Sequence, residues 1–457
     1  MTRRAIAICA ALVIVATSAL ADAKPGGIAR QLAMGGSNVR SGLAVNPFIF
    51  RDPAFMLLNP AYQGYYKDYV WLNVAGGSLS GFGSADRYGA QNAGVNFSLA
   101  RRFTIGTVLS YDPSLTNTVV SQLASFVNQV QPGRAQTGLA PVEVLELTGT
   151  VDVGPADVGI GLMYGRSKND QETSGPSLAG SKAEHSASVL GIRAGLLWNL
   201  GRGSAVDASA AVRFDNVSDN LTGTNTAGSP TNNGEYSASA TELEVIARAT
   251  LKMSRTTSFV PYAAYGMVSG EPKQDAPPTG GTAFTGSQEI SASVLAVGAG
   301  LEYETDEFYF AGGLSWQTAS FETKVTPPPP ATGTTTTTQS VTGLPVINMG
   351  AEWWFLEWLA GRFGYYRAFA TTTNKNEPPT GGVTTEQNRF AGISIVNIGN
   401  YTGTDNSLIT LGVGLQFGGF ALDAMVSEDA LRRGVGLVGP SDNLNTFGYI
   451  TASYAFE

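Results

Sequence analysis

Apolar and polar residues alternate strictly in many segments between about residue 69 and the C-terminus. Residues 408–417 show this most clearly, with apolar side chains at Ile409, Leu411, Val413, Leu415 and Phe417. Residues 190–200, 205–215 and 241–253 repeat the pattern. Because successive side chains of a strand point to opposite faces, each segment is predicted to be a β-strand with one apolar face. A length of about ten residues suits a tilted strand that crosses a membrane.

The links between these strands alternate in length along the chain. Short links are predicted near residues 100–102, 154–156, 201–203, 254–256, 305–307, 356–358 and 418–419. Long polar links are predicted near residues 112–141, 167–184, 216–236, 269–288, 322–340, 371–403 and 428–445. This sorting places all tight turns at one end of an antiparallel up-and-down sheet, which is typical of outer-membrane barrels. The fold class is therefore predicted to be all-β, a transmembrane barrel of 14 to 16 strands, with 16 as our count between Tyr69 and Phe456.

Low-complexity stretches fall inside the predicted long links. Residues 270–281 and 326–339 are rich in Pro, Gly and Thr, and we expect them to be loops. Residues 119–130 have the spacing of a short helix.

The first 21 residues have the organisation of a secretory signal peptide. Arg3 and Arg4 precede an apolar run from residue 5 to 16, and Ala19-Leu20-Ala21 offers the small residues of a cleavage site. Cleavage after Ala23 is an equally good alternative. After this leader no uninterrupted apolar stretch is long enough for a spanning helix.

Composition fits a barrel and narrows the chemistry. Charged residues make up 14% of the chain against about 25% in soluble domains, and 56 of 457 residues are Gly. A net charge of −8 gives no electrostatic case for nucleic-acid binding. The single cysteine, Cys9, lies in the leader, and His185 is the single histidine. We therefore expect no metal site and no cofactor.

His185 is the one residue that suggests catalysis. It is predicted where a long link enters a strand, with Ser186 and Ser188 nearby. A histidine in such a place is usually solvated, and the chain has no GxSxG nucleophile motif. We expect that the protein is not an enzyme.

The polar faces of the strands carry charges of both signs, which we predict to point into the lumen. The principal set is Asp207, Arg213, Glu242, Glu244, Arg248 and Arg362, with Glu146, Asp152, Asp215, Lys252, Glu302, Glu304, Glu352 and Asp423 in addition. We expect cross-strand ion pairs that fill and rigidify the lumen. The alternative, an acid/base pair at Glu242 and Glu244, has no other support in the sequence.

Residues 24–64 do not alternate, yet they are apolar and punctuated by Gly and Pro. They contain the sequences QLAMGGS at 31–37 and RDPAFMLLNPA at 51–61. This resembles the N-terminal pattern of the FadL-type family of outer-membrane long-chain fatty acid and hydrocarbon transporters, a group that includes TodX-like and related shuttle barrels. The C-terminal TLGVG at 410–414, Leu422-Asp423 and Tyr454-Ala455-Phe456 are similar to the group as well. Glu457 after the terminal aromatic residue and our count of 16 strands depart from its pattern.

The resemblance implies a 14-stranded barrel whose lumen is closed by an N-terminal hatch. With the leader described above, the predicted division is a signal peptide over residues 1–21, a hatch or plug over 22–66 and a barrel over 67–457. The residues expected to line the ligand pathway are Phe48, Phe50, Phe55, Met56, Leu58, Asn59, Pro60 and Ala61. A plain turn is the alternative interpretation of Asn59-Pro60-Ala61, because Asn-Pro often begins a turn.

Together these features predict a monomer in the bacterial outer membrane that transports hydrophobic small molecules, such as long-chain fatty acids or aromatic hydrocarbons. Its partners would be this ligand and the outer-membrane lipid. Two alternatives stay open: a structural or secretion-associated barrel, and a general diffusion porin.

Overall fold

The computed structural model describes residues 26–40, 43–75, 92–111, 143–173, 181–222, 234–276, 286–327, 333–389, 407–426 and 447–456. Five short elements come first: α2 (Ile28–Ala33), β1 (Ser37–Arg40), β2 (Leu43–Val45) and the 3-10 helices η1 (Pro53–Leu57) and η2 (Pro60–Gly64). The strands of the wall follow: β3 (Tyr69–Ala75), β4 (Asn92–Ala100), β5 (Phe103–Tyr111), β6 (Glu143–Asp152), β7 (Ala156–Thr173), β8 (Ser181–Gly201), β9 (Ser204–Thr222), β10 (Gly234–Lys252), β11 (Thr257–Ala276), β12 (Ser287–Glu304), β13 (Phe308–Thr326), β14 (Thr335–Leu356), β15 (Leu359–Glu377), β16 (Thr384–Arg389), β17 (Ser407–Phe417), β18 (Phe420–Val426) and β19 (Phe447–Ala455). Among these described residues no helix has the length and apolar character needed to span a membrane.

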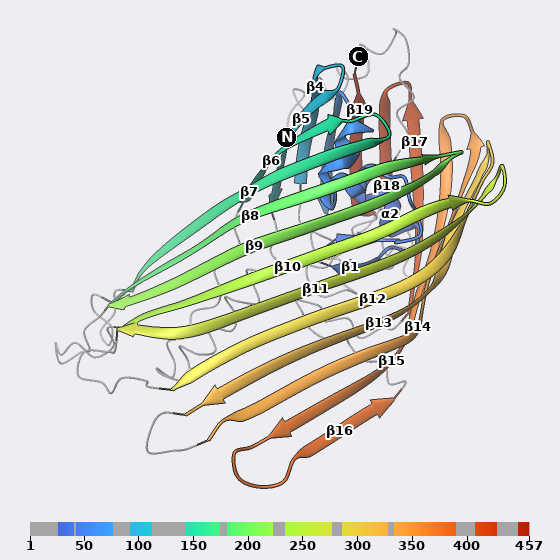
Figure 1. The fold of residues 1–457 in the computed structure, drawn as a ribbon. Helices are drawn as coiled ribbons and strands as arrows, with labels where there is room; N and C mark the ends of the chain where they lie inside the picture. Colours follow the sequence, from blue (N-terminus) through green and yellow to red (C-terminus); the bar gives the residue numbers. More distant parts are fainter. Residues whose placement is uncertain are drawn as a thin grey trace, which may run out of the picture.

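The wall is a closed antiparallel barrel (Figure 1). It closes where β19 pairs with β3, with Ala455 opposite Tyr69. Strands β16 and β17 pair with different parts of the same neighbour, since β15 meets β17 through residues 359–367 and β16 through residues 371–376. The two therefore occupy one position in the wall. The barrel thus has 16 wall positions, which confirms the predicted count and exceeds the 14 that the family resemblance implied.

All seven predicted short links are tight turns in the structure. The turn between β8 and β9 contains two glycines for a conformational reason. Its residues Gly201, Arg202 and Gly203 all have positive φ, between 54° and 81°. A glycine adopts this left-handed region without steric cost, so the two glycines leave a single residue, Arg202, to be accommodated there.

The long links are shorter than predicted, because the strands from β7 to β15 continue into them. These strands have 18 to 22 residues, whereas β3–β6 and β17–β19 have 7 to 11. The stretches 270–276 and 335–339, which we expected in loops, are strand. Both faces of the sheet carry polar residues in these stretches, so the alternation disappears from the sequence. Thr nevertheless favours strands. The predicted links 112–141 and 428–445, the helix-like stretch 119–130 and the leader lie outside the described residues.

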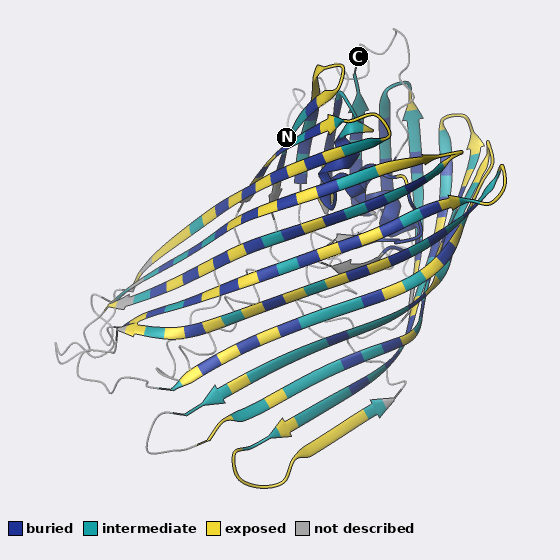
Figure 2. Cartoon of the chain, in the orientation of Figure 1, coloured by how far each residue is buried: buried dark blue, intermediate teal, exposed yellow. Residues whose placement is uncertain are grey.

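Alternation in burial is regular along the long strands (Figure 2). On β10 the residues with even numbers from 234 to 250 are buried and those between them are more exposed. The outer face is apolar, with Leu162, Leu190 and Leu314 more than half exposed. Near the turn end it also carries aromatic side chains, among which Trp358 stacks on Phe417 with ring centroids 5.6 Å apart.

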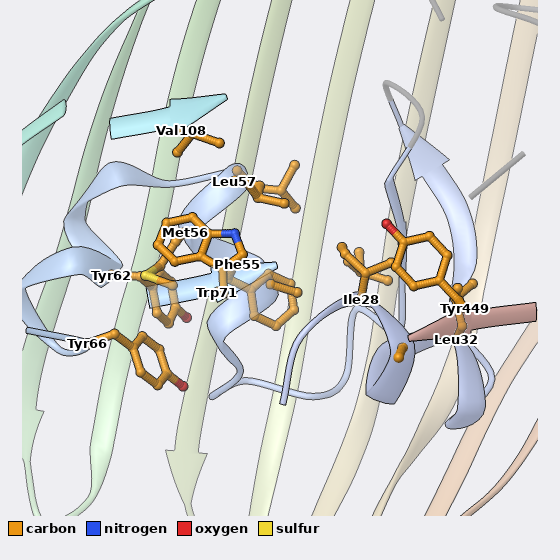
Figure 3. Packing of buried hydrophobic residues seen from close by; sticks show 14 of the residues in the cluster. Ile28, Leu32, Phe55, Met56, Leu57, Tyr62, Tyr66, Trp71, Val108 and Tyr449 are labelled. Atoms are coloured by element: carbon orange, nitrogen blue, oxygen red, sulfur yellow. The ribbon is translucent and has the colours of Figure 1, made fainter. Parts of the chain in front are cut away.

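The N-terminal elements lie within the barrel, on the side of the tight turns (Figure 1). We call residues 26–36 and 45–66 the inner segment. Its α2 helix, for example, is buried throughout. Figure 3 shows how its apolar side chains pack against the wall: Phe55, Met56 and Leu57 lie near Trp71 of β3 and Val108 of β5, and Ile28 and Leu32 lie near Tyr449 of β19.

Candidate functional site

Glycines of the wall allow the backbone of the inner segment to lie directly on the sheet. A Cβ atom added at Gly350 would lie 2.5 Å from the carbonyl oxygen of Met34, and one at Gly364 would lie 2.1 Å from the backbone nitrogen of Gly35. At Gly159 the same atom would lie 2.5 Å from the backbone nitrogen of Ala61. No real Cβ contact is this short, so these three positions require glycine as long as the segment stays where it is.

An ion pair between Arg248 of β10 and Asp207 of β9 holds the middle of the inner segment. The Arg248 Nε donates to Asp207 Oδ2 over 2.8 Å, and its Nη1 donates to the carbonyl oxygen of Ile49 over 2.9 Å. Its Nη2 donates to the Tyr62 hydroxyl over 3.0 Å. Asp207 also accepts from Asn59 Nδ2, over 2.5 Å. Because Arg248 and Asp207 are almost fully buried, each depends on the other and on the inner segment for its polar contacts.

Two phenylalanines of the inner segment flank the same guanidinium. The Arg248 Cζ lies 3.6 Å from the ring centroid of Phe55 and 5.3 Å from that of Phe50. A desolvated guanidinium over an aromatic face is stabilised by about 2 kcal/mol. The guanidinium therefore lies close to two rings and is also held by hydrogen bonds.

A second cluster holds the start of the inner segment. Arg30 of α2 donates through Nε to Glu352 of β14 and through Nη1 to Asp52, both over 2.9 Å. Arg362 of β15 joins it by donating to Glu352 over 2.5 Å, and it lies 2.6 Å from Asp423 of β18. Burial raises the pKa of the Asp52 carboxyl above its ordinary value, and the Arg30 charge opposes this shift.

Two further contacts lie on either side of the first pair. Arg193 of β8 pairs with Glu146 of β6 at 3.0 Å and donates to the carbonyl oxygen of Leu57 over 2.6 Å. Glu302 of β12 accepts from the backbone nitrogen of Phe50 over 2.7 Å and from the Tyr309 hydroxyl over 2.6 Å. The inner segment is thus hydrogen-bonded to several sectors of the wall, mostly through its backbone carbonyl and amide groups.

Two cavities lie between the inner segment and the wall. The first, the inner cavity, has about 30 Å³ and is lined by Val45, Pro47, Phe55, Leu58, Asn59, Asp207, Ser209, Ile246, Arg248, Tyr262 and Ala264. The second, the turn-end cavity, has about 260 Å³ and is lined by Arg30, Phe50, Arg51, Gly203, Thr250, Lys252, Ser258, Glu302, Glu304, Thr305, Asp306, Phe308, Tyr309, Glu352, Trp354 and Gln416. Exposed turn residues such as Gly203 and Asp306 are part of its lining, so it opens at the turn end.

The eight residues predicted for the ligand pathway are all buried, but only some of them face a cavity. Phe55, Leu58 and Asn59 line the inner cavity, and Phe50 lines the turn-end cavity. Phe48 instead packs edge-on against Tyr262, with centroids 5.5 Å apart. The Met56 sulfur contacts Asn96. Pro60 accepts a hydrogen bond from Thr150 through its carbonyl oxygen, and the Ala61 amide donates to Asn59.

Asn59-Pro60-Ala61 is both a turn and an anchor. The Asn59 side chain caps η2 by accepting from the Ala61 amide, as the plain-turn interpretation required. Its Nδ2 group, however, reaches the wall at Asp207 and at the carbonyl oxygens of Leu196 and Ala208, each of the last two over 3.2 Å. The motif therefore fixes the inner segment to β8 and β9.

The six principal charges predicted for the lumen are all buried and inward-facing. Beyond the inner segment, on the loop side, β9 and β10 carry Asp215, Asp219, Glu242 and Glu244 together with Arg213, which lies 3.5 Å from Glu242. We call these five residues the acidic strip. Among the described residues of this part of β9 and β10, four carboxyl groups face one guanidinium.

His185 differs from its prediction. It lies inside strand β8, only 4% exposed, rather than in a solvated link, and its Nδ1 is in contact with Asp219 Oδ1. Ser186 follows it on the strand and therefore points to the other face, where its hydroxyl pairs with Ser218 over 2.7 Å. His185 and Ser186 are neighbours in the sequence, but the Ser186 hydroxyl does not approach the imidazole.

An apolar surface on the inner face of the loop-side wall was not predicted. It consists of small buried residues on β11–β15, namely Val268, Ile290, Ala292, Ala319, Val341 and Ala370. We call it the apolar panel. Their outward neighbours are mostly polar, for example Glu289, Ser320 and Ser340, so the apolar face of the strands is the inner one here. The prediction had assigned the polar face of each strand to the lumen. Arg30, Asp52 and Arg193 were also not predicted as site residues. For Asp52, the signal available in the sequence was the Asp-Pro pair at 52–53.

No model of a protein family matches the chain, and no curated protein matches it either. Among solved structures, the toluene transporter TodX of P. putida is 12% identical, with 95% of this chain and 99% of that chain covered and a TM-score of 0.36. The CymD monoaromatic hydrocarbon channel is 11% identical over 93% and 98% of the two chains, with a TM-score of 0.34. The ferric yersiniabactin receptor FyuA of Yersinia pestis is 11% identical over 85% and 80%, with a TM-score of 0.33. TodX and CymD are barrels of the FadL type, the family that the N-terminal motif resembles.

Proposed function

We propose that this protein is an outer-membrane barrel that takes up uncharged hydrophobic small molecules, with the inner segment as a hatch that closes its lumen. The observation that supports this most directly is the inner cavity, because Phe55, Leu58, Ile246 and Tyr262 make it largely apolar and both hatch and wall contribute to it. Its volume of about 30 Å³ is far below the roughly 150 Å³ that holds benzene, so a ligand could enter this place only if the inner segment moves.

The apolar panel supports a hydrophobic solute. It lies on the inner face of five neighbouring strands toward their loop ends, where polar side chains such as Gln288 and Thr372 are also buried. Apolar surface of this kind favours transfer of an apolar solute from water by about 25 cal/mol per Å² buried. On the route that we propose, from the loop end to the inner cavity, a solute would pass these apolar side chains.

The acidic strip favours an uncharged solute over a fatty-acid anion. It lies on β9 and β10, next to β11, where the apolar panel begins, and its guanidinium, Arg213, lies 3.5 Å from Glu242. Arg248 in the inner cavity is likewise engaged by Asp207, Tyr62 and Ile49. A carboxylate would lose its hydration next to groups of its own sign, which is costly in a medium of low dielectric constant.

The outer face supports a membrane location. Exposed leucines and valines alternate with inward residues over the wall, and aromatic side chains gather near the turn end. Such aromatic residues are typical of the water–lipid boundary of outer-membrane barrels. Because the hatch lies inside the turn-end half of the barrel, a selective transporter is favoured over an open diffusion porin.

The test compares two solutes of equal length, dodecan-1-ol and dodecanoate, at a pH well above the pKa of the carboxylic acid. Cells that make the protein should accumulate radiolabelled dodecanol faster than cells with the empty vector, and dodecanoate no faster. In planar bilayers the full chain should conduct poorly, and a variant without residues 26–61 should form an open channel. Equal acceleration of both solutes would refute the charge argument, and unchanged conductance after the deletion would refute the hatch.

A further inference from the structure

The outer face of the long strands changes character twice between the turn end and the loop end. On β11 the outward residues that follow Met267 are Ser269, Glu271, Lys273 and Asp275. The same order, from large apolar through hydroxyl-bearing to charged residues, holds on β8, β13 and β15. The apolar part is the lipid-facing belt of the proposed barrel. The hydroxyl-bearing and charged residues therefore begin where the hydrocarbon of the membrane ends.

The charged residues form ion pairs within their own strands. In each pair a lysine and a carboxylate are two residues apart, so both side chains lie on the same face. We call the following ten residues the charged band: Lys168–Asp170 on β7, Lys182–Glu184 on β8, Lys273–Asp275 on β11, Glu322–Lys324 on β13 and Lys375–Glu377 on β15. The five lysine side chains are 41–64% exposed. An exposed pair contributes at most about 1 kcal/mol, so the band stabilises the wall little.

The charged band begins beyond the height of the apolar belt. Lys168 lies 12 residues from the start of β7 at Ala156, and Lys182 lies 19 residues from the end of β8 at Gly201. A tilted strand gains roughly 2.5 Å in height per residue, so these lysines lie about 30–50 Å above the turns, whereas the apolar belt of such barrels is about 25 Å tall. Phospholipid headgroups occupy only about 5–8 Å beyond the hydrocarbon. The band therefore reaches the level of a thicker headgroup, one that contains several sugars.

Carboxylates outnumber lysines on this part of the outer face. Glu172, Glu271 and Glu289 also face outward and are exposed. Glu172 lies opposite Lys182 on the neighbouring strand, and Glu289 lies opposite Lys324. Carboxylate and phosphate oxygens both bind Mg²⁺ and Ca²⁺, whereas a lysine ammonium binds phosphate directly. Such a surface is complementary to phosphate groups when divalent cations lie between the two.

We propose that the charged band and the hydroxyl-bearing residues below it form a contact surface for a phosphorylated glycolipid of the outer leaflet. Hydroxyl groups such as those of Ser269 and Ser320 exchange hydrogen bonds with its sugars. The lysines bind its phosphates directly, and the carboxylates bind them through divalent cations. The surface continues the apolar belt without a break, so a lipid whose acyl chains cover the belt places its headgroup here. This inference rests on the membrane location in the proposed function and is independent of the solute.

The experiment measures binding of fluorescent lipid A, a glucosamine disaccharide with two phosphates, to the full chain in phosphatidylcholine nanodiscs with Mg²⁺. Exchange of four lysines for glutamine should weaken the apparent Kd about tenfold or more; the variant is Lys168→Gln/Lys182→Gln/Lys324→Gln/Lys375→Gln. The same four lysines changed to arginine should leave the Kd unchanged. The control removes four charges from exposed turns, as Arg101→Gln/Arg102→Gln/Arg202→Gln/Arg255→Gln, and should bind like the unmodified protein.

Three further measurements identify what the surface binds. EDTA in place of Mg²⁺ should weaken binding to the unmodified protein, and so should monophosphoryl lipid A in place of lipid A. Inorganic phosphate should not compete, and competition by it would overturn the glycolipid as the partner. Equal binding of lipid A by the lysine-to-glutamine variant and the unmodified protein overturns the contact surface and leaves the band as a solvated face. Failure of the full chain to insert into plain phosphatidylcholine vesicles, measured by protease protection, would instead overturn the membrane location.

Discussion

The Arg248–Asp207 pair offers the sharpest test of how the inner segment is held. Arg248→Met keeps the length and apolar stem of the side chain but removes the charge. The variant loses the hydrogen bonds to Ile49 and Tyr62 and leaves Asp207, 2% exposed, without its cation. Removing one member of a buried pair typically costs about 3–5 kcal/mol. We expect that cost to appear as easier opening of residues 46–62 rather than as unfolding of the barrel.

Removing both charges should restore much of this stability. In Arg248→Met/Asp207→Leu no buried charge is left, so the remaining cost is that of the lost hydrogen bonds, about 1–3 kcal/mol in total. The assay is hydrogen exchange of backbone amides in residues 46–62, which reports the free energy of local opening. Arg166→Met, on the exposed outer face of β7, is the control and should not change the exchange.

The outcome is read as a double-mutant cycle. If the double variant opens as easily as the sum of the two single variants predicts, the charges are not coupled and the pair does not hold the segment. If both single variants exchange like the unmodified protein, the hydrogen bonds to Ile49 and Tyr62 contribute nothing to its position.

Two further changes test the contacts of the same segment. Gly364→Ala places a methyl group 2.1 Å from the Gly35 nitrogen, so we expect displacement of residues 34–36 at a cost of about 1–3 kcal/mol, measured by hydrogen exchange. The control is Gly149→Ala, whose added methyl group would lie 3.7 Å from its nearest neighbour and should have no effect. Equal hydrogen exchange in the two variants would disprove the close approach. Asn59→Asp brings a second carboxylate to Asp207 in place of an amide donor, which should destabilise the segment by about 1–3 kcal/mol and lower the melting temperature in detergent. The control, Asn169→Asp at an exposed position of β7, should leave the melting temperature unchanged. An unchanged melting temperature of Asn59→Asp would mean that the amide contact is dispensable.

The sequence was informative wherever one face of a strand is apolar and the other is polar. Ile409 to Phe417 alternates because one face is apolar, and this gave the strand count and the seven tight turns. It was uninformative where both faces have the same environment, as in residues 335–339, which are strand despite their loop-like composition. His185 was misplaced for the same reason.

The candidate site could be predicted only as a set of residue types. Inward charges such as Asp207 and Arg248 follow from the alternation on their own strands. Their partners in the inner segment do not, because Ile49 and Leu57 contribute backbone carbonyl oxygens, which every residue possesses. The cavities depend on which side chains face which wall sector, and this is set by tertiary packing of residues far apart in the chain.

The wall glycines beneath the inner segment help to fix its position, whereas other residues determine the chemistry of the inner cavity. Position is set in part by backbone lying on backbone at Gly159, Gly350 and Gly364, where the inner segment meets the wall through Ala61, Met34 and Gly35. The chemistry of the inner cavity is set by other side chains, such as Phe55 and Leu58. On the proposed uptake function, those side chains can change while the inner segment keeps its place, so that a change of preferred ligand would need few compensating substitutions in the wall.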